Sequence, residues 1–313
     1  MTTAKPMRLL FVGAGAVGGF LAARTLEAGH DATVLVHPAR ARALREHGLV
    51  LATQSASTTT RPAVVTADEL TDGFDAVVLA VKADVLGSAI TDIAPAVTPA
   101  TMVVPFLNGM GHLGPLVDRF GSSVIGGVLR VATELRADGA VRVLNPTFEV
   151  EIGELDGQPS ERTDALGDAF RAAGADVTVS GDIVREMWAK WVFIASIGAV
   201  TGLLRAPVGE IVSVPGGEAF ARAVVAEADS VAAAAGYPLT SASRQGLERT
   251  VTTPGSPLTS SLSRDLLDGR PTEVEPVLGD LVARAVTAGL PVPYLTAATL
   301  ALRVHNHRLL ARS

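Results

Sequence analysis

The chain has 313 residues, of which 48% are hydrophobic and 19% charged, so one large packed domain or two ordinary ones can form. It has no cysteine, which excludes disulfides, thiolate metal sites and a thiol nucleophile. The net charge of −6 and the pI near 5.5 argue against a general nucleic-acid binder. The opening MTTAKPMRLL lacks the apolar segment of a signal peptide, and the longest apolar run, 191–204, is short for a membrane span. We therefore expect a soluble, cytoplasmic protein.

The first predicted elements form a strand–helix–strand unit around a cluster of glycines. Residues 9–12 (LLFV) are apolar on both faces, as in the centre of a parallel sheet that helices cover. The motif GAGAVG follows at 13–18 and opens a helix over 17–27, after which a second strand is predicted over 32–36. A G-x-G-x-x-G in this context is typical of a dinucleotide-binding site.

Each glycine of the motif has a physical role in such a site. Gly13 permits the tight turn, Gly15 lets a pyrophosphate approach the backbone, and Gly18 lets the helix pack against the strand. The start of the helix offers free N–H groups and a positive dipole end to the phosphates. The alternative is a glycine-rich turn that binds nothing. The predicted cofactor contacts of this loop are Gly13, Gly15, Ala16, Val17 and Gly18.

The end of the second strand indicates which dinucleotide is bound. An Asp or Glu there would hold the ribose 2′-hydroxyl of NAD. This chain has His37 instead, then Arg40, Arg42 and Arg45, and no carboxylate before Glu46. Guanidinium groups match phosphate oxygens in a bidentate way, so His37, Arg40 and Arg42 predict NADP. The alternative is an ordinary solvated basic helix start.

The rest of the first half continues the alternation of strands and helices. A hairpin is predicted over 131–144 around Asp138-Gly139. The other predicted elements are strands over 74–81, 101–105, 123–128, 148–152 and 176–179 and a helix over 161–173. Lys82 and Asn108 follow two of these strands at the carboxyl edge of the sheet, where ligands bind. Lys82 can equally be an ordinary exposed lysine.

The second half changes to helices only. From residue 182 onward no strand pattern is found, and 252–257 (TTPGSP) forms a loop between helices. Helical spacing is clearest in the apolar positions 274, 277, 278, 281, 282 and 285. We predict a Rossmann-type doubly wound sheet domain over 1–181, which binds NADP, and an all-helical domain over 182–313 for substrate binding or dimerisation.

Lys190 stands out in the helical half. It is the only ionisable side chain from Met187 to Leu204, and it shares a helix face with Met187 and Ile194. Burying a lysine ammonium without a partner costs about several kcal/mol, or it lowers the pKa of the lysine. Such a lysine is often a proton donor or a charge clamp. The alternative is a lysine that extends along a helix edge into solvent.

With these residues in place, the chain resembles the ketopantoate reductase (2-dehydropantoate 2-reductase) family over nearly its whole length. The motifs that carry the resemblance are GAGAVG at 13–18, VKAD at 81–84, LNGMG at 107–111, IGELDG at 152–157, MWAKW at 187–191, SSLSRDL at 260–266 and PTEVEPVLGDLVARA at 271–285. The resemblance implies a Rossmann-type domain, a helical domain, an active site in the cleft between them, and NADPH as reductant. It also implies reduction of ketopantoate to pantoate, a step of pantothenate biosynthesis.

The same resemblance implies roles for individual residues. Lys190 matches the catalytic lysine that donates a proton to the developing oxyanion. Glu273 matches the active-site glutamate, although by itself it reads as a first-turn helix carboxylate. Asn108 matches an asparagine near nicotinamide and substrate, Ser261 a serine that contacts the substrate carboxylate, and Lys82 a lysine near the cofactor ribose.

Three positions depart from the family pattern. The family has asparagines four and eight residues after the lysine, where this chain has Ile194 and Gly198. Ser196 lies nearby but points elsewhere on a helix. His37 also stands where the family has an arginine. The substrate site is therefore expected to favour a more apolar 2-oxo acid than ketopantoate.

Two other functions stay open at this point. One is an NADP-dependent dehydrogenase of the same fold that acts on another oxo or hydroxy acid, and the other is a non-catalytic NADP-binding sensor. Lys190, Asn108 and Glu273 together argue against the sensor, since it needs none of them. His305 and His307 do not share a helix face, so no metal is expected. We expect a small-molecule substrate and no nucleic-acid or membrane partner, and leave a homodimer open.

Overall fold

A computed structural model describes residues 6–311; residues 1–5, which belong to the opening stretch examined above for a signal peptide, and residues 312–313 lie outside it. The chain divides into two compact units. The first unit holds Met1–Leu107 and His112–Glu186, and the second holds Asn108–Gly111 and Met187–Ser313. The loop that carries Asn108 thus belongs to the same unit as Lys190, although it directly follows a strand of the first unit.

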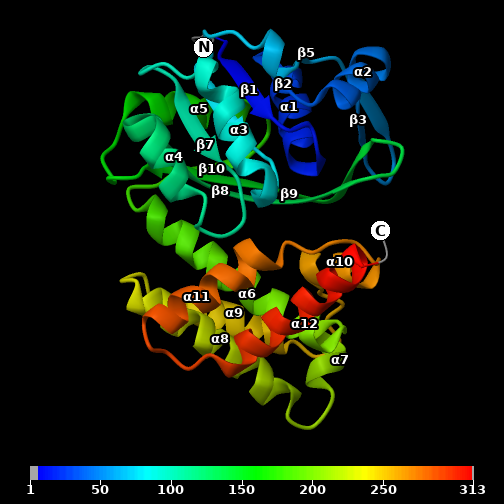
Figure 1. The fold of residues 1–313 in the computed structure, drawn as a ribbon, viewed down its shortest axis with the longest axis vertical. Helices are drawn as coiled ribbons and strands as arrows, with labels where there is room; N and C mark the ends of the chain where they lie inside the picture. Colours follow the sequence, from blue (N-terminus) through cyan, green and yellow to red (C-terminus); the bar gives the residue numbers. More distant parts are fainter. Residues whose placement is uncertain (1–5, 312–313) are drawn as a thin grey trace. The chain divides into compact units, whose positions relative to one another are not determined.

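The first unit is built on a parallel sheet with strand order β5-β2-β1-β6-β7 (Figure 1). The strands are β1 (Arg8–Val12), β2 (Asp31–Leu35), β5 (Ala63–Val65), β6 (Ala76–Leu79) and β7 (Met102–Pro105). The helical segments between them are α1 (Ala16–Glu27), α2 (Pro38–His47), η1 (Ala67–Glu69), η2 (Ala83–Val85), α3 (Leu86–Ile93) and η3 (Ala94–Ala96). The prediction of a Rossmann-type sheet is confirmed.

The central strand β1 shows why the sheet is covered on both faces. Successive side chains of a strand point to opposite faces. Leu9 and Phe11 enter one hydrophobic cluster, whereas Leu10 and Val12 enter another. A strand that is apolar at every position therefore buries both of its faces, as the sequence predicts for β1.

The first unit also contains a second, mixed sheet, which includes strands that the sequence analysis did not predict. Its order is β10-β9-β3-β4, with β8 antiparallel to β9. The strands are β3 (Leu49–Ala52), β4 (Ser57–Thr60), β8 (Ile125–Leu135), β9 (Val141–Glu154) and β10 (Asp176–Val179); the helical segments of this part are α4 (Leu113–Phe120), η4 (Gly121–Ser123) and α5 (Glu161–Ala172). The sequence analysis did not predict β3, β4 or β5, because they are short and β4 (STTT) has no apolar alternation.

The hairpin around Asp138-Gly139 is present, but its strands are longer than predicted. Gly139 has φ +83°, in the left-handed region that glycine tolerates, and Arg136 N donates to Ala140 O at 2.9 Å. The predicted separate strands over 123–128 and 148–152 are the far ends of β8 and β9.

The second unit contains only helices among the described residues. They are α6 (Ile183–Leu204), α7 (Val208–Val212), α8 (Gly217–Ala234), α9 (Ser241–Thr252), α10 (Ser261–Leu267), the π-helical η5 (Glu275–Gly279), α11 (Asp280–Thr287) and α12 (Pro293–Leu310). Helix α6 begins in the first unit and continues into the second. The π-helical turn interrupts the helix that the sequence predicted over 274–285, and its Val277 carbonyl accepts a hydrogen bond from Trp191 Nε1 at 2.8 Å.

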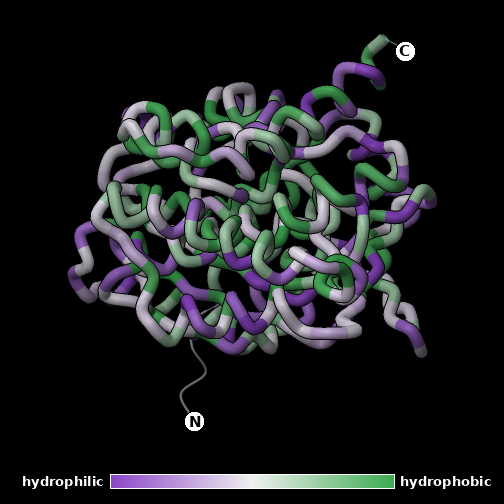
Figure 2. Tube along the Cα trace, turned by 90° about the horizontal axis from the view of Figure 1, so that it is seen from below, coloured by the Kyte–Doolittle hydropathy of each residue, from purple (hydrophilic) through white to green (hydrophobic). Residues whose placement is uncertain are grey.

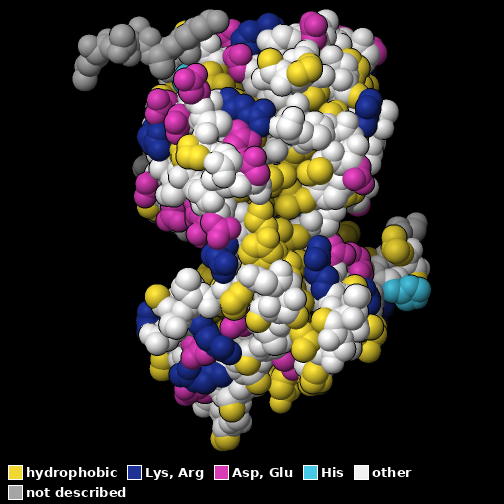
Figure 3. Space-filling view, turned by 90° about the vertical axis from the view of Figure 1, so that its left-hand side faces the viewer, with side chains coloured by type: hydrophobic (Ala, Val, Ile, Leu, Met, Phe, Trp, Pro, Cys, Tyr) yellow, Lys and Arg dark blue, Asp and Glu magenta, His cyan; other side chains and the backbone are white. Residues whose placement is uncertain are grey.

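Helix α6 is long and apolar enough to cross a membrane, by length and composition alone. Two thirds of its most apolar window, 67%, is buried inside the structure, as in the core helix of a globular protein, so this is weak evidence for a span. In Figure 2 the hydrophobic stretches of the trace gather in its interior and many hydrophilic ones at its edges. On the face shown in Figure 3, acidic and basic side chains are intermixed.

Candidate functional site

The glycine loop of the first unit has the geometry of a phosphate cradle. Gly13 adopts φ +91°, and a side chain on it would meet Ala80 O at 3.1 Å. A Cβ on Gly18 would lie 1.9 Å from Gly13 O, so helix α1 packs on the loop with no room for a side chain. A Cβ on Gly15 would meet nothing within 4 Å. Open space at Gly15, directly at the start of α1, is what a pyrophosphate needs.

A cavity of about 780 Å³ opens over this loop within the first unit. Its walls come from the carboxyl ends of β1, β2 and β6 and from the segments that follow them. Of the predicted cofactor residues, it is lined by Gly13, Gly15, His37, Arg40 and Lys82. The structure therefore brings five predicted residues from three strand ends to one cavity, which is large enough for a dinucleotide by the usual size of ligand pockets.

Arg40 and Arg42 lie differently although both come from the start of α2. Arg40 Nη2 donates to Ala14 O at 3.2 Å and to Gly139 O at 3.0 Å, and it joins the glycine loop to the β8–β9 turn. Burial lowers the pKa of this guanidinium. The Arg42 side chain is exposed and, within residues 6–311, makes no hydrogen bond or ion pair. Arg42 is therefore the side chain better placed to receive a ligand anion.

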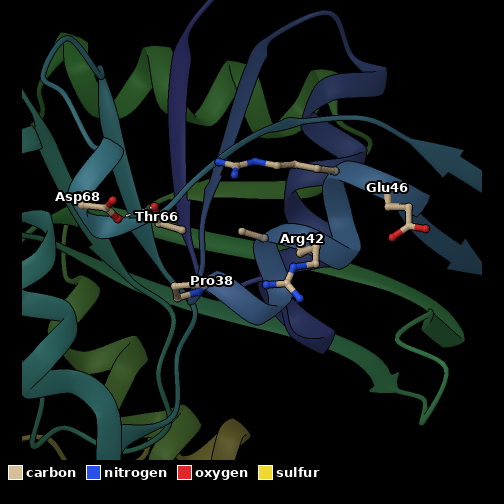
Figure 4. A pocket seen from close by; sticks show the side chains of 7 residues that line it. Pro38, Arg42, Glu46, Thr66 and Asp68 are labelled. Carbon is tan, nitrogen blue, oxygen red and sulfur yellow. Dashed lines mark hydrogen bonds between the residues drawn. The ribbon is translucent and has the colours of Figure 1, made fainter.

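Arg42 borders a second cavity of about 590 Å³ in the first unit, shown in Figure 4. There Arg42 extends from α2 on one side of Pro38, and Thr66 and Asp68 lie on the other side. Thr66 Oγ1 donates to Asp68 Oδ1 at 2.6 Å, and this hydrogen bond keeps the pKa of the Asp68 carboxyl below its usual range. Asp68 and Thr66 line both cavities, and in the second cavity the Asp68 carboxylate lies across from Arg42.

Thr66 and Asp68 were missed by the sequence analysis. A signal was present, because Thr66 and Glu69 form a capping box: the Glu69 carboxylate accepts from Thr66 N at 2.9 Å. That pattern marks the start of a helical turn, and only the pairing of β5 with β2 brings this turn beside His37 and Pro38.

The predicted catalytic residues lie in the second unit. Lys190 is half-buried on α6, one helical turn before Ile194, so the two side chains share a face. Glu273 is half-buried and directly precedes the helix that contains the π-helical turn. Trp191 is 1% exposed, and its hydrogen bond to Val277 O joins α6 to that turn. The helix of Lys190 and the segment after Glu273 are thus held by one buried contact.

A small cavity in the second unit, here called the acyl cavity, has a volume of about 150 Å³. Its polar lining residues are Asn108, Thr259, Ser260 and Ser261. Its apolar lining residues are Phe193, Ile194, Ile197, Leu258, Leu262 and Val277. Three predicted substrate residues, Asn108, Ile194 and Ser261, therefore meet in one cavity with a polar and an apolar lining.

The space in front of Gly198 is filled by other side chains. A Cβ at Gly198 would lie 3.0 Å from Leu262 Cδ1 and 3.8 Å from Val277 Cγ1, so these side chains already fill that space. Ser196 is fully buried, and its hydroxyl has no hydrogen-bond partner in the described part of the chain. Within those residues no group of three or more His, Asp or Glu side chains is arranged to hold a metal ion.

Comparisons with known proteins show which family the chain is similar to. The family model described as ketopantoate reductase PanE/ApbA matches residues 9–157, and the model of its C-terminal part matches residues 182–306. The chain is 33% identical over 290 residues to the uncharacterized oxidoreductase YkpB of Bacillus subtilis, with 92% of this chain and 95% of the relative covered. It is 29% identical over 323 residues to 2-dehydropantoate 2-reductase of Mesorhizobium japonicum, with 95% and 97% covered.

A solved structure shares the fold at lower sequence identity. The ternary structure of D-mandelate dehydrogenase with NADH and anilino(oxo)acetate superposes with a TM-score of 0.85 at 20% identity, over 97% of this chain and 100% of that one. At this identity the likeness concerns the fold.

Proposed function

Because the chain belongs to the ketopantoate reductase family, whose members are oxidoreductases, we propose that it reduces the carbonyl group of a 2-oxo acid with NADPH. One observation carries the proposal: a phosphate cradle with open space at Gly15 occurs in the same chain as a cavity lined by Asn108 and Ser261. The unit that holds this cavity also holds Lys190 and Glu273.

The residues of the first unit fit a nicotinamide dinucleotide. Gly13, Gly15 and the start of α1 would hold the pyrophosphate, and Lys82 and His37 would lie along the cavity toward the ribose groups. Arg42 would receive the 2′-phosphate of NADP. When bound, the reduced cofactor supplies a hydride.

The residues of the second unit would handle the charge and the proton. Negative charge develops on the carbonyl oxygen during reduction, and the Lys190 ammonium stabilises that oxygen and gives it a proton. Asn108 and Ser261 would hold the carbonyl and carboxylate groups by hydrogen bonds. Glu273 would orient the lysine or a substrate hydroxyl. The apolar wall with Ile194 excludes water from the substrate tail.

The substrate that the family implies is ketopantoate, and the site departs from it in one respect. The wall that Ile194 and Leu262 form offers methyl groups where the family has amides. Leaving the ketopantoate hydroxyl without a hydrogen bond costs about 1–3 kcal/mol. We therefore infer that a 2-oxo acid with an apolar tail is used at least as well. D-mandelate dehydrogenase, whose structure holds the oxo acid derivative anilino(oxo)acetate, is an example of this fold with such a ligand.

An NADPH-oxidation screen over 2-oxo acids tests the proposal. Ketopantoate, 2-oxobutanoate, 4-methyl-2-oxopentanoate and phenylglyoxylate are compared by kcat/KM, with NADH in a parallel series. We expect at least one apolar 2-oxo acid to equal or exceed ketopantoate. A kcat/KM for ketopantoate above about 10⁴ M⁻¹s⁻¹ that also exceeds the values for every apolar acid would contradict the apolar preference. Oxidation with none of the acids would contradict the proposed function itself.

The cytoplasmic location and a homodimer stay predictions. Cell fractionation measures the first, and sedimentation equilibrium of the purified full chain measures the second.

A further inference from the structure

The acyl cavity ends at a contact between α6 and α10. In this contact the side chain of Leu262 fills the space next to Gly198. Gly198 on α6 has no side chain, and Leu262 on α10 occupies the volume in front of it, with Cδ1 at 3.0 Å from the place of a Cβ. Leu262 is 2% exposed and lines the cavity. Its position therefore decides how far the apolar wall reaches into the cavity.

Helix α10 is held to α6 by buried polar contacts, so Leu262 cannot easily move away. Thr201 Oγ1 and Ser260 Oγ are hydrogen-bonded at 2.9 Å, and Ser260 N donates to Thr201 Oγ1 at 3.3 Å. Ser263 Oγ donates to Thr201 O at 3.3 Å. Ser260 and Ser263 lie two residues before and one residue after Leu262, and both contact Thr201 on α6. Any change of size at Gly198 or Leu262 is therefore transferred to the cavity.

We propose that Leu262, packed against Gly198, sets the depth of the acyl cavity and thereby selects the length of the substrate tail. This inference rests on the proposed function, because the substrate is taken to be a 2-oxo acid. Asn108 and Ser261, two of the four polar lining residues, receive the oxo-acid group, while Leu262 and Val277 limit the apolar tail. One methylene more or less in such a pocket changes selectivity by about 10- to 200-fold.

Two substitutions change the cavity in opposite directions. Leu262→Ala deepens it, so the ratio of kcat/KM for 2-oxooctanoate to that for 2-oxobutanoate rises by about tenfold or more. Gly198→Ala presses on Leu262 and drives it into the cavity, so the same ratio falls. The double variant Gly198→Ala/Leu262→Ala returns toward the wild-type ratio. The matched control is Leu266→Ala, which removes a buried leucine of the same helix that does not line the cavity.

The readouts separate this inference from the proposed function. Isothermal titration calorimetry with each acid measures the tail preference without any reduction. If the wild type binds the acids but oxidises NADPH with none of them, the proposed function fails and calorimetry still decides the role of Leu262. If Leu262→Ala does not fold, Leu262→Val must shift the ratio in the same direction. A ratio that stays unchanged in the Leu262 variants, or that shifts equally in Leu266→Ala, overturns the inference, as does binding of neither acid.

Discussion

At the scale of single residues, the proposed chemistry depends on Lys190. The side chain is half-buried on a helix whose next turns are apolar, so its ammonium is partly removed from water. Charge on a nearby oxyanion is stabilised more strongly there than in bulk water.

Lys190→Ala is expected to lower kcat by about 10²–10⁴, the usual contribution of a positioned proton donor, with the Kd for NADPH near the wild-type value. Steady-state kinetics and calorimetry measure the two quantities. Lys190→Met keeps the length of the side chain and is the control for packing. Normal turnover in Lys190→Met would show that Lys190 is only a lysine that extends along a helix edge into solvent. Loss of the fold in both variants would indicate a structural role.

Arg42 and Arg45, both on α2, are expected to behave differently. Arg42→Ala removes an exposed guanidinium, and the Kd for NADPH should rise about 10- to 100-fold, since a hydrogen bond to a charged group contributes about 1.5–3 kcal/mol. The Kd for NADH should stay near the wild-type value. The matched control is Arg45→Ala, because Glu69 and the Val64 carbonyl, at 2.9 Å, already hold that guanidinium. Equal Kd values for NADPH and NADH in the wild type would refute a 2′-phosphate contact and point to Asp68 as a ribose ligand.

At the scale of elements, the contact between α6 and α10 limits the size of the side chain that α6 can have at position 198. A family-like site would need Ile194→Asn with Gly198→Asn, but any side chain at position 198 meets Leu262. Overpacking of this kind costs about 1–3 kcal/mol. The double variant is therefore expected to lose thermal stability with little gain in ketopantoate turnover.

Adding Leu262→Ala should change that outcome. The triple variant has room for the new amide, and kcat/KM for ketopantoate is expected to rise by about tenfold over the wild type, as one recovered hydrogen bond predicts. Thermal melts and NADPH-oxidation kinetics of the double and triple variants provide the comparison. A double variant that is as stable and as active as the triple would show that Leu262 does not limit this position.

At the scale of the whole molecule, an ion pair of the first unit contributes to stability against acid. Arg162 donates to both carboxylate oxygens of Glu154, at 2.7 and 2.6 Å, and Ser160 adds a third hydrogen bond at 2.6 Å. The Arg162 guanidinium holds the pKa of the Glu154 carboxyl below its usual range. A lowered folded-state pKa gives stability that is present above the unfolded pKa, about 4.3, and is lost as the pH falls through the folded value.

Glu154→Gln is therefore expected to lower Tm at pH 7, by about 2–4 °C for each kcal/mol lost, while the difference from wild type shrinks below about pH 4. Thermal melts from pH 3 to 8 measure it. Asp168→Asn is the control, since Asp168 pairs with Arg171 on the surface and its side chain is 64% exposed. A difference that does not depend on pH would assign the loss to packing.

The sequence by itself determined the β-α-β unit, the glycine loop and the change to helices after residue 182, because these features are local. Leu9–Val12 is apolar at every position, and the glycines at 13, 15 and 18 follow at once, so neighbouring residues specify each element. The residues alone singled out Lys190 and Asn108, and the family resemblance added Glu273 and Ser261. Of these, Asn108 and Ser261 line one cavity with Ile194.

Only the tertiary structure decided which residues share a surface. Asp68 lines the cavity over the glycine loop because β5 pairs with β2, the Arg40 guanidinium donates to two backbone carbonyls, and Leu262 fills the space at Gly198. Each of these contacts joins residues between about 26 and 99 positions apart in the chain. Hydrophobic spacing and motif order carry no information on such contacts, because they depend on how packed elements fill the volume between them.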